Sequence, residues 1–142
     1  MKILHIVSSL DEKYGGPSIL VPEISYKQNE FKNKVDILTT YFKKEEDTSE
    51  NFYCKNGVNF KRFKVFSKYR ISIKLFIWFL NNLQKYDVVH VHSIYRFPLD
   101  ITIVLSFLKK QNIVFSPHGS LDPYLFNRSD NKLFGIFCKK LI

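Results

Sequence analysis

The sequence predicts an α/β fold, a Rossmann-like open and mainly parallel sheet with helices on both faces. Short β-branched or aromatic runs alternate with stretches of helical length and spacing. Three of the runs are almost continuously apolar, as expected for parallel strands covered on both faces. The 142 residues amount to about one domain, residues 1–142, and a hydrophobic share of 45% excludes intrinsic disorder for most of the chain.

The expected elements follow one another as strands and helices, with one polar interruption. The predicted strands are Lys2 to Ser8, Lys34 to Thr40, Asn59 to Phe66, Asp87 to His92 and Asn112 to Pro117. The predicted helices are Pro17 to Phe31, Ser67 to Lys85 and Pro98 to Lys110. Tyr41 to Val58 is polar, so we expect a surface excursion there, with Asn56-Gly57 as the turn of a small hairpin. Ser129 to Ile142 is expected to be a helix without a stop signal, which favours a truncated chain.

Composition excludes several classes of protein. The longest apolar run, residues 75–80, is too short to cross a bilayer, and polar residues from His5 onward interrupt any signal peptide. We therefore predict a cytoplasmic protein. Cys54 and Cys138 are too few for a disulfide framework and are expected to be reduced thiols.

The charge of +9 (22 basic minus 13 acidic residues) favours anionic partners such as phosphates or acidic lipid head groups. Part of this charge looks like biased coding, because the chain has 18 Lys, only 4 Arg and no Ala. A nucleic-acid binder is the weaker alternative, since few arginines and no nucleic-acid motif are present. We expect no nucleic-acid partner.

The junction after the first predicted strand contains Gly15-Gly16-Pro17. Two glycines let the backbone approach a ligand closely, and Pro17 suits the first turn of a helix. The N–H groups and dipole of that helix end would form an anion site suited to a diphosphate. The alternative is a tight turn with no ligand. The pattern is neither G-x-G-x-x-G nor a Walker loop.

The fourth predicted strand ends in a pair of histidines. Strand alternation places His90 and His92 on one face, and His92 lies at the end where ligands bind in open α/β sheets. No nearby carboxylate or cysteine completes a metal site, so we expect no metal and a packed, hydrogen-bonded His90. His92, Tyr95 and Arg96 are candidates for contact with a polar substrate.

His118 follows the fifth predicted strand, between Pro117 and Gly119. This arrangement presents an imidazole at the strand end, where it could act as a general base or bind a sugar hydroxyl. Asp122 precedes Pro123, and the alternative to a ligand role for Asp122 is that it caps a helix.

Four ordered segments carry a resemblance to a known family. They are residues 1–7 (MKILHIV), 13–18 (KYGGPS), 87–92 (DVVHVH) and 116–123 (SPHGSLDP). Together they resemble the amino-terminal half of family 4 glycosyltransferases of the GT-B fold. The resemblance covers essentially the whole chain, in the same order and at suitable spacing.

The resemblance implies an acceptor-side domain that faces a second, nucleotide-binding domain, which these 142 residues lack. It implies transfer of a sugar from a nucleotide-sugar, with retention and without cofactor or metal, to a glycan or lipid-linked acceptor in surface polysaccharide synthesis. Gly15 and Gly16 would lie beside the donor diphosphate and His118 would be the catalytic residue at the donor sugar. We assign acceptor or sugar binding to His92, Tyr95, Arg96, Gly119 and Asp122.

Catalysis is expected only with the second domain. The alternatives are a non-catalytic binding half that needs a separate partner subunit, and an inactive relic.

The predicted helix from Ser67 to Lys85 has an apolar face and several basic residues. Such a helix can lie on an anionic membrane, which would make the protein peripheral on the inner face of the cell membrane. The alternative is a core helix with basic residues at its margin. The apolar residues are Ile71, Leu75, Trp78 and Phe79, and the basic ones are Lys68, Arg70, Lys74 and Lys85.

Overall fold

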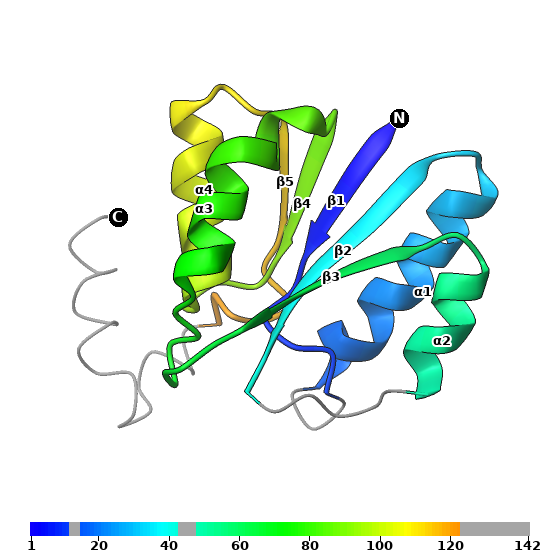
Figure 1. Ribbon diagram of the computed structural model, residues 1–142, viewed down its shortest axis with the longest axis horizontal. Helices are drawn as coiled ribbons and strands as arrows, with labels where there is room; N and C mark the ends of the chain where they lie inside the picture. Colours follow the sequence, from blue (N-terminus) through cyan, green and yellow to red (C-terminus); the bar gives the residue numbers. More distant parts are fainter. Residues whose placement is uncertain (12–14, 43–47, 123–142) are drawn as a thin grey trace.

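In the computed structural model, which describes residues 1–11, 15–42 and 48–122, a five-stranded sheet lies between two pairs of helices (Figure 1). The strand order is β3-β2-β1-β4-β5, and all four pairings are parallel. The Rossmann-like prediction is therefore confirmed. The elements are β1 (Lys2–Ile6), α1 (Gly16–Glu30), β2 (Lys34–Tyr41), α2 (Thr48–Lys55), β3 (Asn59–Lys64), α3 (Ile73–Asn82), the 3-10 helix η2 (Leu83–Lys85), β4 (Val88–His92), α4 (Phe97–Leu108) and β5 (Ile113–Ser116).

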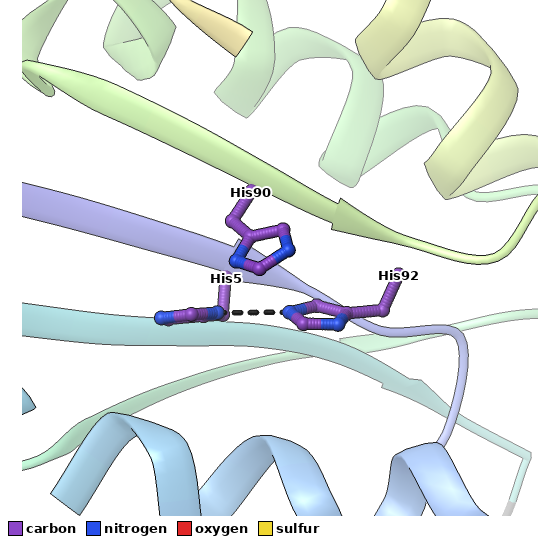
Figure 2. A group of neighbouring side chains, drawn as sticks. All are labelled: His5, His90 and His92. Carbon is purple, nitrogen blue, oxygen red and sulfur yellow. Dashed lines mark hydrogen bonds between the residues drawn. The ribbon is translucent and has the colours of Figure 1, made fainter. Parts of the chain in front are cut away.

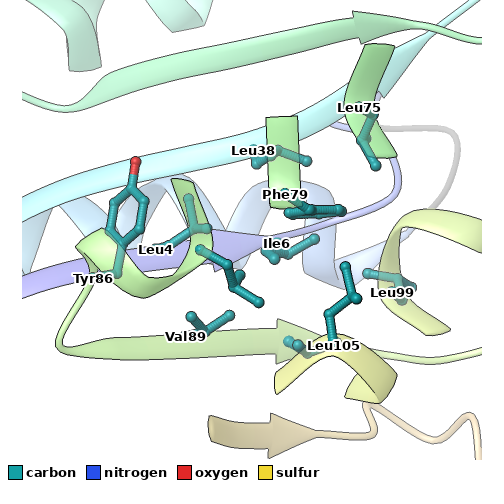
Figure 3. Close-up of a cluster of buried hydrophobic side chains, with 11 residues drawn as sticks. Leu4, Ile6, Leu38, Leu75, Phe79, Tyr86, Val89, Leu99 and Leu105 are labelled. Atoms are coloured by element: carbon teal, nitrogen blue, oxygen red, sulfur yellow. The ribbon is translucent and has the colours of Figure 1, made fainter. Parts of the chain in front are cut away.

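One face of the sheet carries the larger apolar core (Figure 3). Alternate residues of β1 and β4, among them Ile6 and Val91, pack there against Phe79 of α3 and Leu99 of α4. The other face packs against α1 and α2 and has a smaller apolar cluster of Val7, Leu10, Val21, Ile37 and Val58. Strand alternation therefore gives each face its own layer of side chains.

The polar segment before β3 does not form a hairpin, contrary to the sequence prediction. It contains α2, after which Gly57 adopts a left-handed conformation (φ +87°) and its N–H bonds to the carbonyl of Cys54 at 3.1 Å. A glycine in this conformation commonly ends a helix. The same Asn-Gly pair therefore stops α2, and β3 then pairs parallel to β2.

The helix predicted from Ser67 is shorter than expected. Arg70 has a positive φ of 63°, so a right-handed helix cannot run through it. Ser72 caps α3 instead, because its Oγ accepts the N–H of Leu75 at 3.4 Å. Ile71 and Arg70 therefore lie outside the helix.

The apolar face of α3 is used inside the protein. Leu75 and Phe79 are fully buried, and Trp78 packs against Phe63 and Tyr86. Leu75 and Phe79 therefore belong to the core, as the core-helix alternative predicts. Ile73, Ile77 and Leu80 of the same helix are exposed, so membrane association stays a prediction. None of the described helices has the length and apolarity to cross a membrane. The helix expected from Ser129 to Ile142 lies outside the described residues.

Candidate functional site

The topology brings the predicted site segments to one edge of the sheet. From β1 the chain runs one way through β2 to β3, and β4 then returns to the other side of β1. Ligands of open α/β sheets bind beyond the carboxyl ends of the strands at such a reversal. Since β1, β4 and β5 are parallel neighbours, the loops that follow them share this edge.

The helix α1 begins at this edge with an open backbone. Gly15 is its N-cap, with φ +94° and no side-chain cap, and Gly16 is the first helical residue. Both glycines are exposed, and a Cβ at either position would meet no heavy atom of the described residues within 4 Å. The positive end of the helix dipole is therefore left uncovered by the described residues, and an anion could bind there. This geometry is compatible with both predicted alternatives, an anion site and a tight turn without a ligand, since Gly15 also makes the turn that starts α1.

A buried arginine that the sequence assigned to a helix surface ties two loops together at the same edge. Arg70 is 3% exposed, and its Nη1 donates to the carbonyl oxygen and Oγ1 of Thr40 at 3.2 and 3.0 Å. Thr40 Oγ1 donates in turn to the carbonyl oxygen of Ser8 at 2.6 Å. The guanidinium thus fixes the ends of β1 and β2 and adds positive charge near the edge.

Three histidines gather on the α1 face of the sheet (Figure 2). His5 of β1 is paired in register with His90 of β4, and His92 follows on the same face. His5 Nδ1 lies 2.9 Å from His92 Nε2, and His90 Nε2 lies 2.8 Å from Ser116 Oγ. The expected packed, hydrogen-bonded His90 is confirmed. His92 is 1% exposed, so it underlies the edge and does not face solvent.

Burial sets the charge state of these histidines. It lowers the pKa of His5 to about 4 and the pKa of His92 still further, since an imidazolium is poorly solvated there. The pKa of His90 is lowered for the same reason. Neighbouring imidazoles add repulsion in each case. The three rings are therefore neutral at pH 7.

His118 completes the edge on the side of β5. His118 and Gly119 both have positive φ, 47° and 79°, and the turn closes with the N–H of Ser120 bonded to the carbonyl of Pro117 at 2.8 Å. This turn exposes His118 and brings its Nε2 to 2.9 Å from His92 Nδ1. The structure therefore joins two of the predicted site residues directly.

The remaining predicted residues lie in adjoining loops. Tyr95 has φ 70° and its N–H bonds to Asp100 Oδ1 at 2.9 Å, while Arg96, the N-cap of α4, donates to the carbonyl of Tyr95 at 3.1 Å. Burial raises the pKa of Asp100. Asp122 is exposed and its N–H bonds to the carbonyl of Gly119 at 2.9 Å. The helix that Asp122 was predicted to cap lies outside the described residues.

Among the described residues, one group of side chains could be considered as a metal site, namely His5, His90 and His92, with ligand atoms within 4.8 Å of one another. Two nitrogens bound tetrahedrally to one zinc ion lie about 3.4 Å apart at Zn–N distances near 2.0–2.1 Å. The 2.9 Å between His5 and His92 is instead a hydrogen-bond distance. The rings of His90 and His92 also overlap, with centroids 4.0 Å apart. This spacing favours a hydrogen-bonded cluster over a metal centre.

Sequence reasoning did not include His5 or Gln28 in the site. Gln28 of α1 accepts from His5 at 2.7 Å, Nε2 to Oε1. A histidine that interrupts an apolar strand was the available signal for His5. Gln28 carried none, because a polar residue on a surface helix is ordinary.

Comparison with known proteins identifies the fold. No protein-family model matches the sequence, and no curated protein matches it. Among solved structures, the chain is similar to HepE (Alr3699) of Anabaena, whose crystal structure was determined in complex with UDP and glucose. The TM-score is 0.59 at 15% sequence identity, over 94% of this chain and 34% of HepE. This chain thus spans about a third of the length of that protein, and the likeness concerns the fold.

Proposed function

We propose that this chain is the acceptor-side half of a GT-B glycosyltransferase, in which a sugar is transferred from a nucleotide-sugar. The observation that carries the proposal is the carboxyl edge of the sheet. The exposed N-terminus of α1 at Gly15 and Gly16 shares that edge with His118, and His118 is hydrogen-bonded to the buried His92. The fold of HepE, which binds UDP and glucose, supports this assignment.

The chemistry of the edge fits the two parts of such a donor. The α1 N-terminus would stabilise the negative charge that develops on the diphosphate leaving group. An imidazole such as His118 would bind a sugar hydroxyl and orient the reacting carbon. The loops with Tyr95, Arg96, Gly119 and Asp122 would bind the sugar and the acceptor. His92 was predicted to do the same, but it is buried at the end of β4, so it would act only through His118.

Several finer features belong to the same proposal. The reaction would proceed with retention and without a metal, and the acceptor would be a glycan or a lipid-linked sugar of surface polysaccharide synthesis on the cytoplasmic side of the membrane. A second nucleotide-binding domain, in the same polypeptide or in a partner subunit, would complete the donor site. The length of HepE relative to this chain is consistent with such a second part.

NMR titration with nucleotide-sugars and with pyrophosphate tests the proposal. At millimolar UDP-glucose, related nucleotide-sugars or pyrophosphate, amide shifts are expected at Gly15, Gly16 and Ser18. The nucleotide-sugars, but not pyrophosphate, are also expected to shift His118 and Gly119. If every ligand of the panel leaves the carboxyl edge unperturbed, or shifts only the opposite edge, the proposal is wrong.

Two substitutions at one position separate charge from shape. Gly16→Asp should keep the fold, because an acidic residue suits the first turn of a helix, but it should abolish pyrophosphate binding by repulsion. Gly16→Ala is the matched control, since its Cβ would meet none of the described residues within 4 Å. Equal binding by the Asp and Ala variants would contradict an anion site at this helix.

A further inference from the structure

A chain of hydrogen bonds runs from helix α1 to the exposed edge of the sheet. Gln28 Oε1 lies 2.7 Å from His5 Nε2, His5 Nδ1 lies 2.9 Å from His92 Nε2, and His92 Nδ1 lies 2.9 Å from His118 Nε2. Figure 2 shows the central contact between His5 and His92. Four side chains from α1, β1, β4 and the turn after β5 are therefore connected in series.

The amide oxygen of Gln28 determines the direction of every proton in this series. A carbonyl oxygen only accepts, so His5 Nε2 carries a hydrogen, and the neutral His5 ring then accepts at Nδ1. His92 must therefore donate from Nε2 and accept at Nδ1, where His118 donates from its own Nε2. The lowered pKa values of His5 and His92 keep these rings neutral, which the argument requires.

We propose that Gln28, His5 and His92 are positioning residues that hold His118 as the Nε2-protonated imidazole and leave its Nδ1 as a hydrogen-bond acceptor at the edge. An acceptor nitrogen binds a group that donates a hydrogen, such as a sugar hydroxyl, and disfavours a phosphate oxygen, which only accepts. The identity of this ligand rests on the proposed function. The tautomer of His118 does not, because the four side chains determine it without a ligand.

The packing around the hydrogen-bonded side chains holds the rings of His5 and His92 in one orientation. His90 lies against His92, with ring centroids 4.0 Å apart, and is itself bonded to Ser116. His5 is fully buried, and His92 is 1% exposed. Neither ring can turn without leaving buried nitrogens unpaired, which is unfavourable inside the protein. His118 thus receives its orientation through two buried rings, those of His5 and His92.

The test is long-range 1H–15N NMR of the histidine rings in the ligand-free protein, which distinguishes protonated from unprotonated nitrogens. The chain has only four histidines, so all the signals can be assigned by single substitutions. His118 is expected to be protonated at Nε2 and unprotonated at Nδ1. A wild-type His118 protonated at Nδ1, or present as a mixture of both tautomers, would overturn the proposal.

Replacing Gln28 by a hydrogen-bond donor and by an apolar group should have different effects on the tautomer of His118. Gln28→Lys offers only hydrogens, so every bond should reverse and His118 should become protonated at Nδ1. Gln28→Met has similar shape but no comparable acceptor, so His118 should become a mixture of tautomers. Lys27→Met, an exposed neighbour on α1, is the matched control and should leave the spectrum of His118 unchanged. A purely structural role of Gln28 would not make Lys and Met differ in this spectrum.

The two proposals can fail separately. If Gln28→Lys does not fold, as judged by circular dichroism, Gln28→Met still answers the question. If a folded variant keeps the wild-type tautomer of His118, the positioning role is wrong even when nucleotide-sugars bind. If both hold, Gln28→Lys should weaken nucleotide-sugar binding about tenfold, the equivalent of one hydrogen bond, with pyrophosphate binding unchanged.

Discussion

The two faces of the sheet bury different chemistry, although the same strands supply both. On the α3 and α4 face, β1 and β4 contribute Leu4, Ile6 and valines to an apolar core. On the α1 face, the alternate residues of those strands are His5, His90 and His92. Burial of apolar area stabilises the first face, whereas the second face requires each ring nitrogen to have a partner. One strand can therefore serve stability and ligand binding through alternate positions.

The largest expected effect is on the apolar face. Phe79→Ala removes a fully buried ring from the core and should lower the free energy of unfolding by about 3–5 kcal/mol. Urea denaturation measures this change. Phe107→Ala, at an 84% exposed position of α4, is the control and should change stability by less than about 0.5 kcal/mol. Similar losses in both variants would contradict the assignment of the core.

Acid should destabilise the histidine face. Between pH 6.5 and about 4 the unfolded chain binds a proton at His5 that the folded protein excludes, so stability falls as the pH falls. His5 alone accounts for about 3 kcal/mol over this range, and stability should not change through His5 above pH 6.5. The buried His92 acts in the same direction.

The measurement is urea denaturation of the wild type and of His5→Phe at several pH values. The variant should lose the His5 contribution and show a shallower fall in stability between pH 6.5 and 4. Parallel curves for the two proteins would show that His5 is not the buried, neutral group described above.

A smaller effect is expected at the glycines of the open helix end. Gly15→Ala forces a side chain into a left-handed backbone and should cost about 1–2 kcal/mol. Gly16→Ala is the control, because its φ is ordinary and a Cβ there would meet none of the described residues, so it should be neutral or slightly stabilising. Thermal or urea unfolding distinguishes them, and equal values would mean that the Gly15 conformation is not required.

The smallest effect has the opposite sign. Ser25 of α1 and Ser106 of α4 are fully buried, and their hydroxyls have no hydrogen-bond partner among the described residues. Ser25→Ala and Ser106→Ala should each stabilise the protein by about 0.5–1 kcal/mol, since alanine also favours a helix. Urea denaturation measures the change. Destabilisation by Ser25→Ala or Ser106→Ala would contradict the prediction, because it would mean that the hydroxyl of that serine makes a stabilising contact.

The fold was largely predictable from the sequence because its strands are separated by clear changes of pattern. The continuous apolar runs of β1 and β4 predicted strands covered on both sides, as the structure has them. The third such run, β5, is instead an edge strand whose Ile113, Val114 and Phe115 are 38–46% exposed. The segments after β1 and β5 predicted the edge with Gly15, Gly16 and His118. The helix α2 was missed because its residues are polar and its Asn-Gly stop is also a hairpin signal. Local sequence alone does not distinguish these two uses of glycine.

The contacts within the site were less predictable. The pairing of His5 with His90 depends on the register between β1 and β4, which no local pattern determines. The position of Arg70 was equally unpredictable. Its charge predicted solvent exposure, but it is buried and donates hydrogen bonds to Thr40, which lies 30 positions earlier in the sequence. Long-range partners decide both cases.

The pairing of Leu4 with Val89 and of His5 with His90 has a consequence for folding. A slip of β4 by a single residue would turn its imidazoles into the hydrocarbon layer and its valines toward α1. Both sides would then be mismatched at once, with polar rings lacking partners and aliphatic groups facing Gln28. The histidines thus discriminate against misaligned strands as the chain folds, before any ligand is encountered.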